Sequence, residues 1–350
     1  MSGTRPVALL ALLVHRGLLS ADAAQRALAA PDPGAFLVQN GFATPQTWRE
    51  WVETEAGTRP RLSRYELGGL LGEGGQARVF AATDRTDGRA LALKILKPEL
   101  VRDPIARERF VLESRLLIDL QSPHVVRGYR VARESEVYFC AMERIDGECL
   151  KDRIEREGPL DEEEALDVVR QIASALATLH DRGLVHRDVK PANVMLDKAG
   201  RAVLIDLGFA VPRGESSAAD TTVGTVHYIA PEQARGAGDL DVRADIYALG
   251  ATLYHLVTGS LPFTGQDNDE VLAKQVLESL SGERIRQLGL SPQLHWFIEK
   301  MMAKEKEFRF QDPRHLAREI ESWLARRREE ERQKGAEDPS RSRRRRRRWL

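Results

Sequence analysis

Two short segments concentrate side chains that could handle phosphate and a divalent cation. The first runs over residues 186–193, with the sequence His-Arg-Asp-Val-Lys-Pro-Ala-Asn, and the second is Asp206-Leu207-Gly208, which begins 18 residues after Asp188. Two short β-type runs, Val194–Leu196 and Val203–Ile205, lie between them. Such a loop, hairpin and loop would bring two carboxylates, an amide and a lysine together. The pattern predicts Mg²⁺ and phosphate binding beside a hydroxyl that is positioned for attack.

A glycine-rich turn joins two further β-type runs. The runs cover residues 65–71 and 77–83, and the turn with its flanks comprises Leu71, Gly72, Glu73, Gly74, Gly75, Gln76, Ala77, Arg78 and Val79. Because glycine has no Cβ, backbone N–H groups in such a turn can approach phosphate oxygens closely. Glycine-rich hairpins also occur without ligands, so this turn alone leaves a nucleotide site and a plain hairpin both open.

Two charged residues occupy positions that the surrounding pattern marks as buried. The alternation of the strand expected over 90–96 turns Lys94 inward. On the helix expected over 104–120, Glu113 shares a face with the apolar residues Phe110, Leu116 and Leu117. An unpaired buried charge costs about several kcal/mol. We therefore expect Lys94 and Glu113 to pair, and the alternative is two unrelated side chains that reach solvent.

Taken together, these features make residues 65–324 resemble a eukaryotic-type (Hanks-type) protein kinase domain, most similar to the bacterial serine/threonine kinases. The resemblance implies an α+β, bilobal protein-kinase fold, with a strand-rich N-lobe over 65–145 and a helical C-lobe over 146–324. It also implies ATP and Mg²⁺ as cofactors, and transfer of the γ-phosphate to Ser or Thr hydroxyls of protein substrates.

The resemblance carries a role to each matching residue. Its catalytic set is Asp188 as the base, Lys190 on the γ-phosphate, and Lys94 on the α- and β-phosphates with Glu113 as its partner. Its magnesium ligands are Asn193 and Asp206. ATP would lie against the glycine-rich turn and against Ala92, Lys94, Met195, the gatekeeper Met142, and the hinge residues Glu143 and Ile145. The resemblance also implies that Glu232 pairs with Arg309 and that Asp245 braces the catalytic loop.

Two positions depart from the pattern of the family. Ala77 replaces the third glycine of the turn, and Leu207 replaces the phenylalanine that usually follows the magnesium aspartate. Neither change removes a phosphate or metal ligand. We expect activity to survive both, because an inactive relative would more typically have lost Lys94, Asp188 or Asp206.

The segment between Asp206 and Glu232 contains four clustered hydroxyls, on Ser216, Ser217, Thr221 and Thr222. A phosphate adds about two negative charges that Arg187 could bind. We expect autophosphorylation at Thr221 or Thr222, and the alternative is a set of ordinary loop hydroxyls. Thr225, together with Lys190, resembles the serine/threonine branch of the family and points to Ser or Thr acceptors.

The two ends of the chain differ from its middle. Residues 1–60 predict a small all-α module of two helix-turn-helix units, with Gly17 and Gly41 ending helices shortly before new ones begin. This module could bind a protein partner or regulate the kinase domain. Residues 325–350 are almost entirely charged and predict a frayed helix that passes into disorder. Their arginines could bind a polyanion or an anionic membrane surface.

Composition limits the remaining classes. The chain of 350 residues is 42% hydrophobic and 30% charged, which is enough for two ordinary domains with buried cores. The last ten residues hold seven arginines, so a formal net charge of zero hides an acidic body with a basic tail. Two cysteines favour a reducing compartment, and the longest apolar run is far too short to span a bilayer. We therefore expect a cytoplasmic protein with no transmembrane segment.

Three other functions remain as alternatives. One is a scaffold or pseudokinase that binds ATP without turnover and acts through its N-terminal module and basic tail. Another is a small-molecule kinase of related fold, which the Ala230-Pro231-Glu232 closure disfavours because it resembles the protein-substrate branch. The third is a nucleic-acid-binding protein that acts through the arginine tail.

Overall fold

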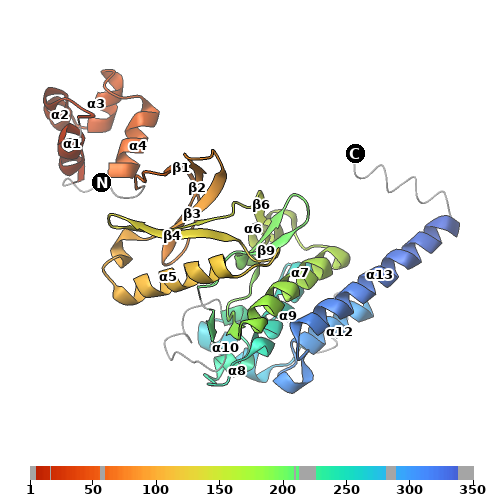
Figure 1. Cartoon of the computed structure of the whole chain (residues 1–350). Helices are drawn as coiled ribbons and strands as arrows, with labels where there is room; N and C mark the ends of the chain where they lie inside the picture. The colour runs from red at the N-terminus through yellow and green to blue at the C-terminus, as the bar shows by residue number, and fades with distance from the viewer. Residues whose placement is uncertain are drawn as a thin grey trace. The chain divides into compact units, whose positions relative to one another are not determined.

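The computed structural model describes residues 5–15, 17–55, 60–208, 210–212, 226–280 and 289–337 (Figure 1). The chain divides into two compact units. The first is formed by Met1–Val111 and Arg130–Arg144, and the second by Leu112–Tyr129 and Ile145–Leu350.

Four short helices form the N-terminal module of the first unit. They are α1 (Arg5–His15), α2 (Ala21–Leu28), α3 (Pro33–Gln39) and α4 (Pro45–Glu55). Gly17 and Gly41 have the positive φ angles, 68° and 73°, that favour glycine at a helix end. Ser20 caps α2 by accepting a hydrogen bond from the backbone N–H of Ala23 at 3.2 Å. The expected helical character of residues 1–60 is thus confirmed over the described part. The four helices enclose a core that includes Leu10, Leu13, Leu37 and Trp51.

A five-stranded antiparallel sheet makes up most of the rest of the first unit. Its strands are β1 (Tyr65–Glu73), β2 (Ala77–Asp84), β3 (Ala90–Leu96), β4 (Gly128–Glu134) and β5 (Val137–Met142), in the order β1-β2-β3-β5-β4. One hydrophobic cluster gathers around Tyr65, Phe80, Leu93 and Phe139. A second joins Ala77 and Leu96 to Phe110 of α5 (Pro104–Asp119). A β-type run over residues 137–142 predicts β5 as well, so the sequence predicted four of the five strands and α5, but it missed β4.

Helices dominate the second unit. They are α6 (Leu150–Glu157), α7 (Glu162–Asp181), α8 (Pro231–Ala234), α9 (Val242–Thr258), α10 (Asn268–Leu277), α12 (Pro292–Met301) and α13 (Pro313–Glu337). Helix α7 packs against both α9 and α13, and α9 also packs against α12 (Figure 1). Because neighbours surround α9, 14 of its residues are buried. Helix α13 continues past Leu324 to Glu337, and residues 338–350 lie outside the described part.

Short strands in the second unit hold the loops that the sequence singled out. They are β6 (Gly147–Cys149), β7 (Leu184–Val185), β8 (Val194–Asp197), β9 (Ala202–Leu204) and β10 (Val211–Pro212). The predicted hairpin is confirmed as β8 and β9, and β6 pairs with the free side of β8. Gly147 is required there, because a Cβ would lie 2.0 Å from the carbonyl oxygen of Leu196. The hairpin separates the two loops that are rich in polar side chains.

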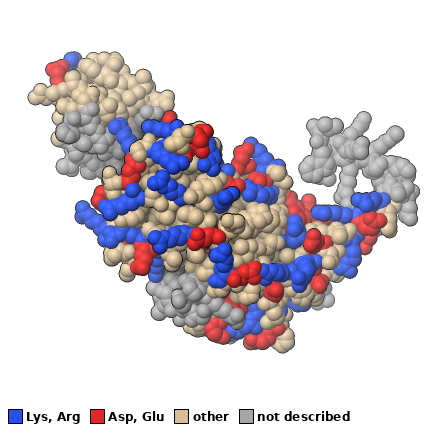
Figure 2. All heavy atoms as spheres, viewed as in Figure 1, with Lys and Arg blue, Asp and Glu red and all other residues tan. Residues whose placement is uncertain are grey.

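Charged side chains of both signs are interspersed over the described surface on the face that Figure 2 shows. The N-terminal module differs, because mainly uncharged atoms cover it in this view. No helix within the described ranges is both long enough and apolar enough to cross a bilayer.

Candidate active site

Asp245 of α9 holds the start of the catalytic loop. Its Oδ2 accepts a hydrogen bond from the backbone N–H of His186, and its Oδ1 accepts one from that of Arg187, both at 2.8 Å. Arg187 has a φ of 67°, a left-handed conformation that is costly for a residue with a Cβ. Burial raises the pKa of the Asp245 carboxyl, whereas the hydrogen bonds from the two backbone amides oppose that rise. The carboxylate thus braces the catalytic loop, as the resemblance implied, and holds the strained backbone of Arg187.

The His186 ring joins this loop to the segment that carries Asp206. Its Nδ1 accepts a hydrogen bond from the backbone N–H of Asp188 at 3.2 Å. Its Nε2 lies 2.6 Å from the carbonyl oxygen of Asp206. A carbonyl can only accept, so Nε2 carries the proton and Nδ1 does not. The neutral ring therefore fixes the spacing between the two loops, a role that the sequence analysis missed.

The Asp188 carboxylate lies between an amide and an ammonium group. Asn193 Nδ2 donates to both the carbonyl oxygen and the Oδ2 of Asp188 at 2.8 Å. Lys190 Nζ also lies 2.8 Å from Oδ2, and both charged side chains are mostly buried. Two donors on Oδ2 leave Oδ1 to accept a further donor, such as a hydroxyl group. The structure thus brings together three of the side chains that the sequence singled out.

Asp206 lies close to this group through the backbone. The N–H of Ile205 donates to the carbonyl oxygen of Asn193 at 3.0 Å. A Cβ added to Gly208 would lie 3.2 Å from Asp206 Oδ1 and 3.6 Å from Glu113 Oε2, so two carboxylates flank this glycine. Leu207 is only 1% exposed and is buried as expected. Two carboxylates this close to one glycine favour the binding of a cation beside them.

The residues present fit a magnesium ion that is shared with phosphate groups. Mg²⁺ in phosphoryl-transfer sites is held by one or two carboxylates together with substrate oxygens and waters. Asp206 supplies a carboxylate. The amide nitrogen of Asn193 donates to Asp188, and its amide oxygen is a hard ligand of the kind that Mg²⁺ prefers. Within the described ranges, no three His, Cys, Asp or Glu side chains form a ready-made metal cage. The carboxylate of Asp206 and the amide of Asn193 suit a metal ion whose other ligands are phosphate oxygens and waters.

The glycine-rich turn leaves its backbone open to a ligand. The N–H of Gly74 donates to the carbonyl oxygen of Ala77 at 2.9 Å and closes the turn. A Cβ at Gly72 or Gly75 would meet no atom within 4 Å, so local packing does not require glycine at either position. The Ala77 side chain is 5% exposed and lies in a core cluster. The alanine is therefore accommodated by the core of the first unit.

The other expected nucleotide contacts lie on strands of both units. In the first unit, Lys94 of β3 lies opposite Cys140 of β5 and Ala92 lies opposite Met142, and the hinge residue Glu143 follows β5. The other hinge residue, Ile145, begins the last segment of the second unit. In the second unit, Met195 lies on β8 and Glu113 is 7% exposed on α5. The expected pair of Lys94 and Glu113 joins two separate units, so it stays a prediction.

A buried ion pair closes the far end of the activation segment. Arg309 binds Glu232 through two parallel bonds, at 2.6 Å and 2.8 Å. Its remaining N–H groups donate to the carbonyl oxygens of Ala303, Arg243 and Lys304. All five donors of the guanidinium are thus used, which satisfies a charge with a side-chain exposure of 0%. The predicted pair of Glu232 and Arg309 is confirmed.

A polar network beside this ion pair was not predicted. Gln275 Nε2 donates to the carbonyl oxygen of His227 at 2.7 Å, and Gln275 Oε1 accepts from Tyr247 Oη at 2.6 Å. Lys304 Nζ donates to the carbonyl oxygen of Gln275 at 2.7 Å and lies 3.2 Å from Tyr247 Oη. The network holds residues 226–228, which belong to the last part of the activation segment. A polar residue inside an apolar helical stripe, as at Gln275, was the one signal that the sequence offered.

Several expected regulatory residues lie outside the described part of the chain. They are Ser216, Ser217, Thr221, Thr222 and Thr225. The structure describes Arg187, the expected binding residue for a phosphate on this segment, and its side chain is mostly buried.

Comparison with known proteins decides the family. The model of the protein kinase domain matches residues 65–320. The chain belongs to the protein kinase family. Its five-stranded sheet then belongs to the N-lobe of the bilobal kinase fold, and the helices from α6 onward belong to the C-lobe.

Curated relatives agree with this assignment. The chain is 36% identical over 263 residues to the serine/threonine-protein kinase PknB of Mycobacterium leprae, a match that covers 73% of this chain and 42% of the relative. It is 33% identical over 261 residues to the serine/threonine-protein kinase PrkC of Bacillus subtilis, covering 74% of this chain and 40% of the relative. The chain thus spans about two fifths of the length of these relatives. Protein kinases in general use ATP and Mg²⁺.

Proposed function

We propose that this chain is a serine/threonine protein kinase that transfers the γ-phosphate of ATP to Ser or Thr hydroxyls of proteins. The observation that carries the proposal is the Asp188 carboxylate, which Lys190 and Asn193 hold at 2.8 Å within a loop braced by Asp245. The names of the bacterial relatives support the same activity.

The proposed roles follow from the needs of phosphoryl transfer. The transition state is loose, so the protein mainly positions the reactants and offsets their charge. Asp188 Oδ1 would accept the hydrogen bond of the substrate hydroxyl and orient its oxygen for attack. Lys190, which is bound to the other oxygen of the same carboxylate, would reach the γ-phosphate. Lys94 would hold the α- and β-phosphates, with Glu113 as its partner.

ATP would lie on the glycine-rich turn, whose backbone is open at Gly72 and Gly75. Asp206 and Asn193 would hold Mg²⁺, which supplies charge neutralisation on the phosphates when bound. Adenine would lie against Ala92, Met142 and Met195, with its edge at the hinge.

We further propose Ser or Thr as the acceptor and the activation segment as a first substrate. Lys190 in the catalytic loop and Thr225 match the serine/threonine branch. A phosphate on Thr221 or Thr222 would order the segment by binding Arg187, whose backbone Asp245 already holds.

Phosphate mapping on the full chain tests the proposal. Purified protein is incubated with Mg-ATP, and phosphorylated residues are located by mass spectrometry and counted over time. We expect Asp188→Asn to lower the rate by about 10²-fold to 10⁴-fold, the usual contribution of a general base. Asp206→Asn should lower it as well, because it removes a carboxylate that would hold Mg²⁺. Asp146→Asn is the matched control, because this exposed carboxylate lies away from the loop in an ion pair with Lys198.

Two outcomes would contradict the proposal. One is phosphorylation at the same rate in Asp206→Asn and in the unchanged chain, which would indicate a contaminating kinase. The other is an absence of phosphate transfer, to the chain or to an added acceptor protein, with ATP binding intact, which would favour the scaffold alternative.

We also propose that the module of residues 1–60 binds a protein partner. Its four helices have a core of their own, so they do not need the sheet to bury their apolar faces. Leu18, Leu28 and Phe42 are 39%, 41% and 37% exposed, which is high for large apolar side chains. These residues are the first positions to change when a partner is tested.

A further inference from the structure

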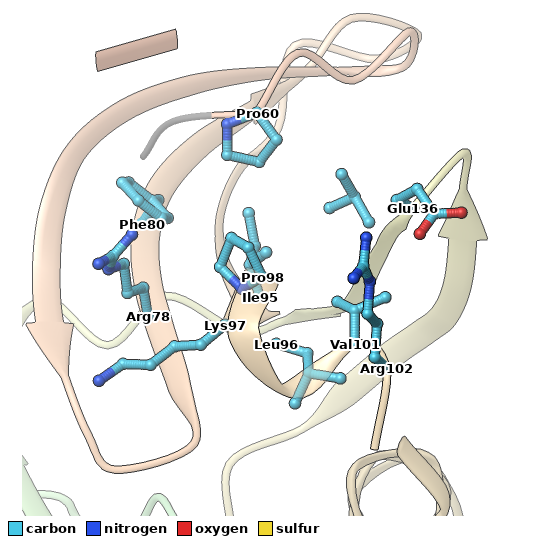
Figure 3. A pocket seen from close by; sticks show the side chains of 11 residues that line it. Pro60, Arg78, Phe80, Ile95, Leu96, Lys97, Pro98, Val101, Arg102 and Glu136 are labelled. Carbon is cyan, nitrogen blue, oxygen red and sulfur yellow. The ribbon is translucent and has the colours of Figure 1, made fainter. Parts of the chain in front are cut away.

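The first unit contains a cavity of about 330 Å³ beside its sheet. Figure 3 shows the side chains around it, which come from Pro60 ahead of β1, from β2, from the end of β3 and the following turn, and from the turn before β5 and the start of that strand. This volume is near the lower end of the range of cavities that hold small organic ligands. Arg78 at the flank of the glycine-rich turn lines it, whereas no residue expected to bind the adenine or the magnesium does. The cavity therefore lies beside the proposed nucleotide site and does not include the adenine or magnesium positions.

The inner wall of the cavity is apolar. It is formed by Phe80, Ile95, Leu96, Val101 and Val137. The first four of these are at most 8% exposed, and they belong to the two hydrophobic clusters of the unit. The cavity therefore reaches the edge of the core, where an apolar group would gain from being buried.

The rim of the cavity is mainly basic. Arg78, Lys97 and Arg102 line it with a single carboxylate, that of Glu136. Figure 3 shows Arg78 and Lys97 on one side, with Arg102 and Glu136 on the other. This excess of positive charge favours an anionic ligand.

Three of the four charged rim residues already have partners. Glu73 of the glycine-rich turn lies 2.9 Å from Lys97 Nζ and 3.3 Å from Arg78 Nε. Glu136 forms an ion pair with Arg133 at 3.4 Å. The guanidinium of Arg102 makes no hydrogen bond or ion pair with any residue in the described ranges. Arg102 is thus the cation that remains available for a ligand.

We propose that this cavity binds a small aromatic carboxylate, with its ring system on the apolar wall and its carboxylate on Arg102. The apolar wall selects a ring, and the planar guanidinium can bind a carboxylate through two parallel hydrogen bonds. The limited volume favours a free small molecule over a folded protein partner. Binding does not depend on phosphoryl transfer.

Titration of the full chain with 2-naphthylacetate tests the site. We expect a dissociation constant of about 1 mM or lower, which follows from the usual affinity per ligand atom. The neutral isostere 2-naphthylacetamide should bind about tenfold more weakly, because it lacks the charge that Arg102 recognises. Arg102→Gln should weaken binding of the carboxylate by about the same factor and leave binding of the amide unchanged.

Two further variants separate this cavity from adventitious binding. Val137→Phe should fill the cavity and abolish binding of both probes. Arg85→Gln is the matched control, because Arg85 is an exposed arginine of the same unit outside the cavity, and this variant should bind as the unchanged chain does. Thermal unfolding of each variant checks that it is folded. Equal affinity for acid and amide, or no effect of Arg102→Gln, would overturn the proposal, and so would an absence of binding by the unchanged chain.

Discussion

Substitution of Asp245 on α9 should change both the stability of the protein and the conformation of the catalytic loop. Its two carboxylate oxygens accept the N–H groups of His186 and Arg187, and it is 1% exposed. An asparagine has one accepting oxygen, so Asp245→Asn leaves one buried N–H facing another donor. We expect the free energy of unfolding to fall by about 1–3 kcal/mol, the cost of an unsatisfied buried group. Denaturant titration measures this change.

The same variant should lose activity because the strained backbone of Arg187 is no longer held. We expect the phosphoryl-transfer rate to fall more than the affinity for ATP. Asp239→Asn is the control, since this aspartate is exposed and its ion pair with Lys306 contributes little to stability. A stability loss of the same size in Asp239→Asn would contradict the argument.

The substitution Arg309→Lys tests whether a positive charge without the five donors of a guanidinium is enough at this position. A lysine keeps the charge but has three donors for the five acceptors that surround Arg309. We expect Arg309→Lys to lower the free energy of unfolding by about 3 kcal/mol, since buried acceptors lose their partners. Thermal or denaturant unfolding checks this value. Arg314→Lys, at an exposed ion pair with Asp181, should change stability by less than about 1 kcal/mol.

The sequence predicted residues that lie within local motifs, and the family resemblance supplied two long-range contacts, those of Glu232 with Arg309 and of Asp245 with the catalytic loop. It missed long-range contacts that belong to no motif. Asp188, Lys190 and Asn193 lie within one loop, so their spacing alone places them together. Tyr247 and Lys304 are 57 residues apart, and neither has a motif that points to the other. The Lys94 and Glu113 pair rests on two burial patterns and remains a prediction.

At the scale of elements, alternation of apolar and polar residues predicted the central strands and failed at an edge. Strand β4 stands at the end of the sheet order and carries Arg130, Arg133 and Glu134. An edge strand tolerates such charges because one of its sides faces solvent. The charges interrupt the apolar pattern by which a strand is recognised in the sequence. Strand β6 has only three residues and pairs with β8, about 50 residues away, so no local pattern could show it.

The contact between α10 and the segment of residues 226–228 should depend on pH through Lys304. Burial, together with the smaller effect of the nearby Arg309, lowers the pKa of Lys304 to about 8. In the unfolded chain the amine keeps an ordinary pKa of about 10.4. Between these two values the unfolded state binds more protons, so the free energy of unfolding rises with pH.

Lys304→Met removes this titration and should flatten the rise. We expect the stability of the unchanged chain, relative to the variant, to increase between pH 7 and about pH 9.5. Burial raises the pKa of Tyr247, the titratable neighbour of Lys304, so the tyrosine stays neutral in the folded protein over this range. Urea titrations at several pH values measure the difference. A constant difference would show that Lys304 does not titrate in this window.

At the scale of the whole molecule, charge separates the tail from the body. Seven of the last ten residues are arginines, and the rest of the chain is acidic. We expect the full chain to bind a DNA duplex at low salt with an affinity that falls steeply as salt rises. A plot of the logarithm of the association constant against the logarithm of the salt concentration should have a slope of about −0.9 for each phosphate neutralised. Deletion of residues 341–350 should abolish this binding. Lysines in place of the six consecutive arginines should preserve it, and binding that salt does not change would contradict the electrostatic explanation.

The bonds from Asp245 to the catalytic loop also affect how that loop exchanges its amide hydrogens with solvent. Most loop amides exchange quickly, because small local motions expose them. The amides of His186 and Arg187 donate to a carboxylate on a helix that is buried among α7 and α12. These two hydrogen bonds can break only when α9 separates from α7 and α12. The exchange of these amides in deuterated buffer should therefore be as slow as that of the core of α9, so that two loop amides report the global unfolding of the second unit.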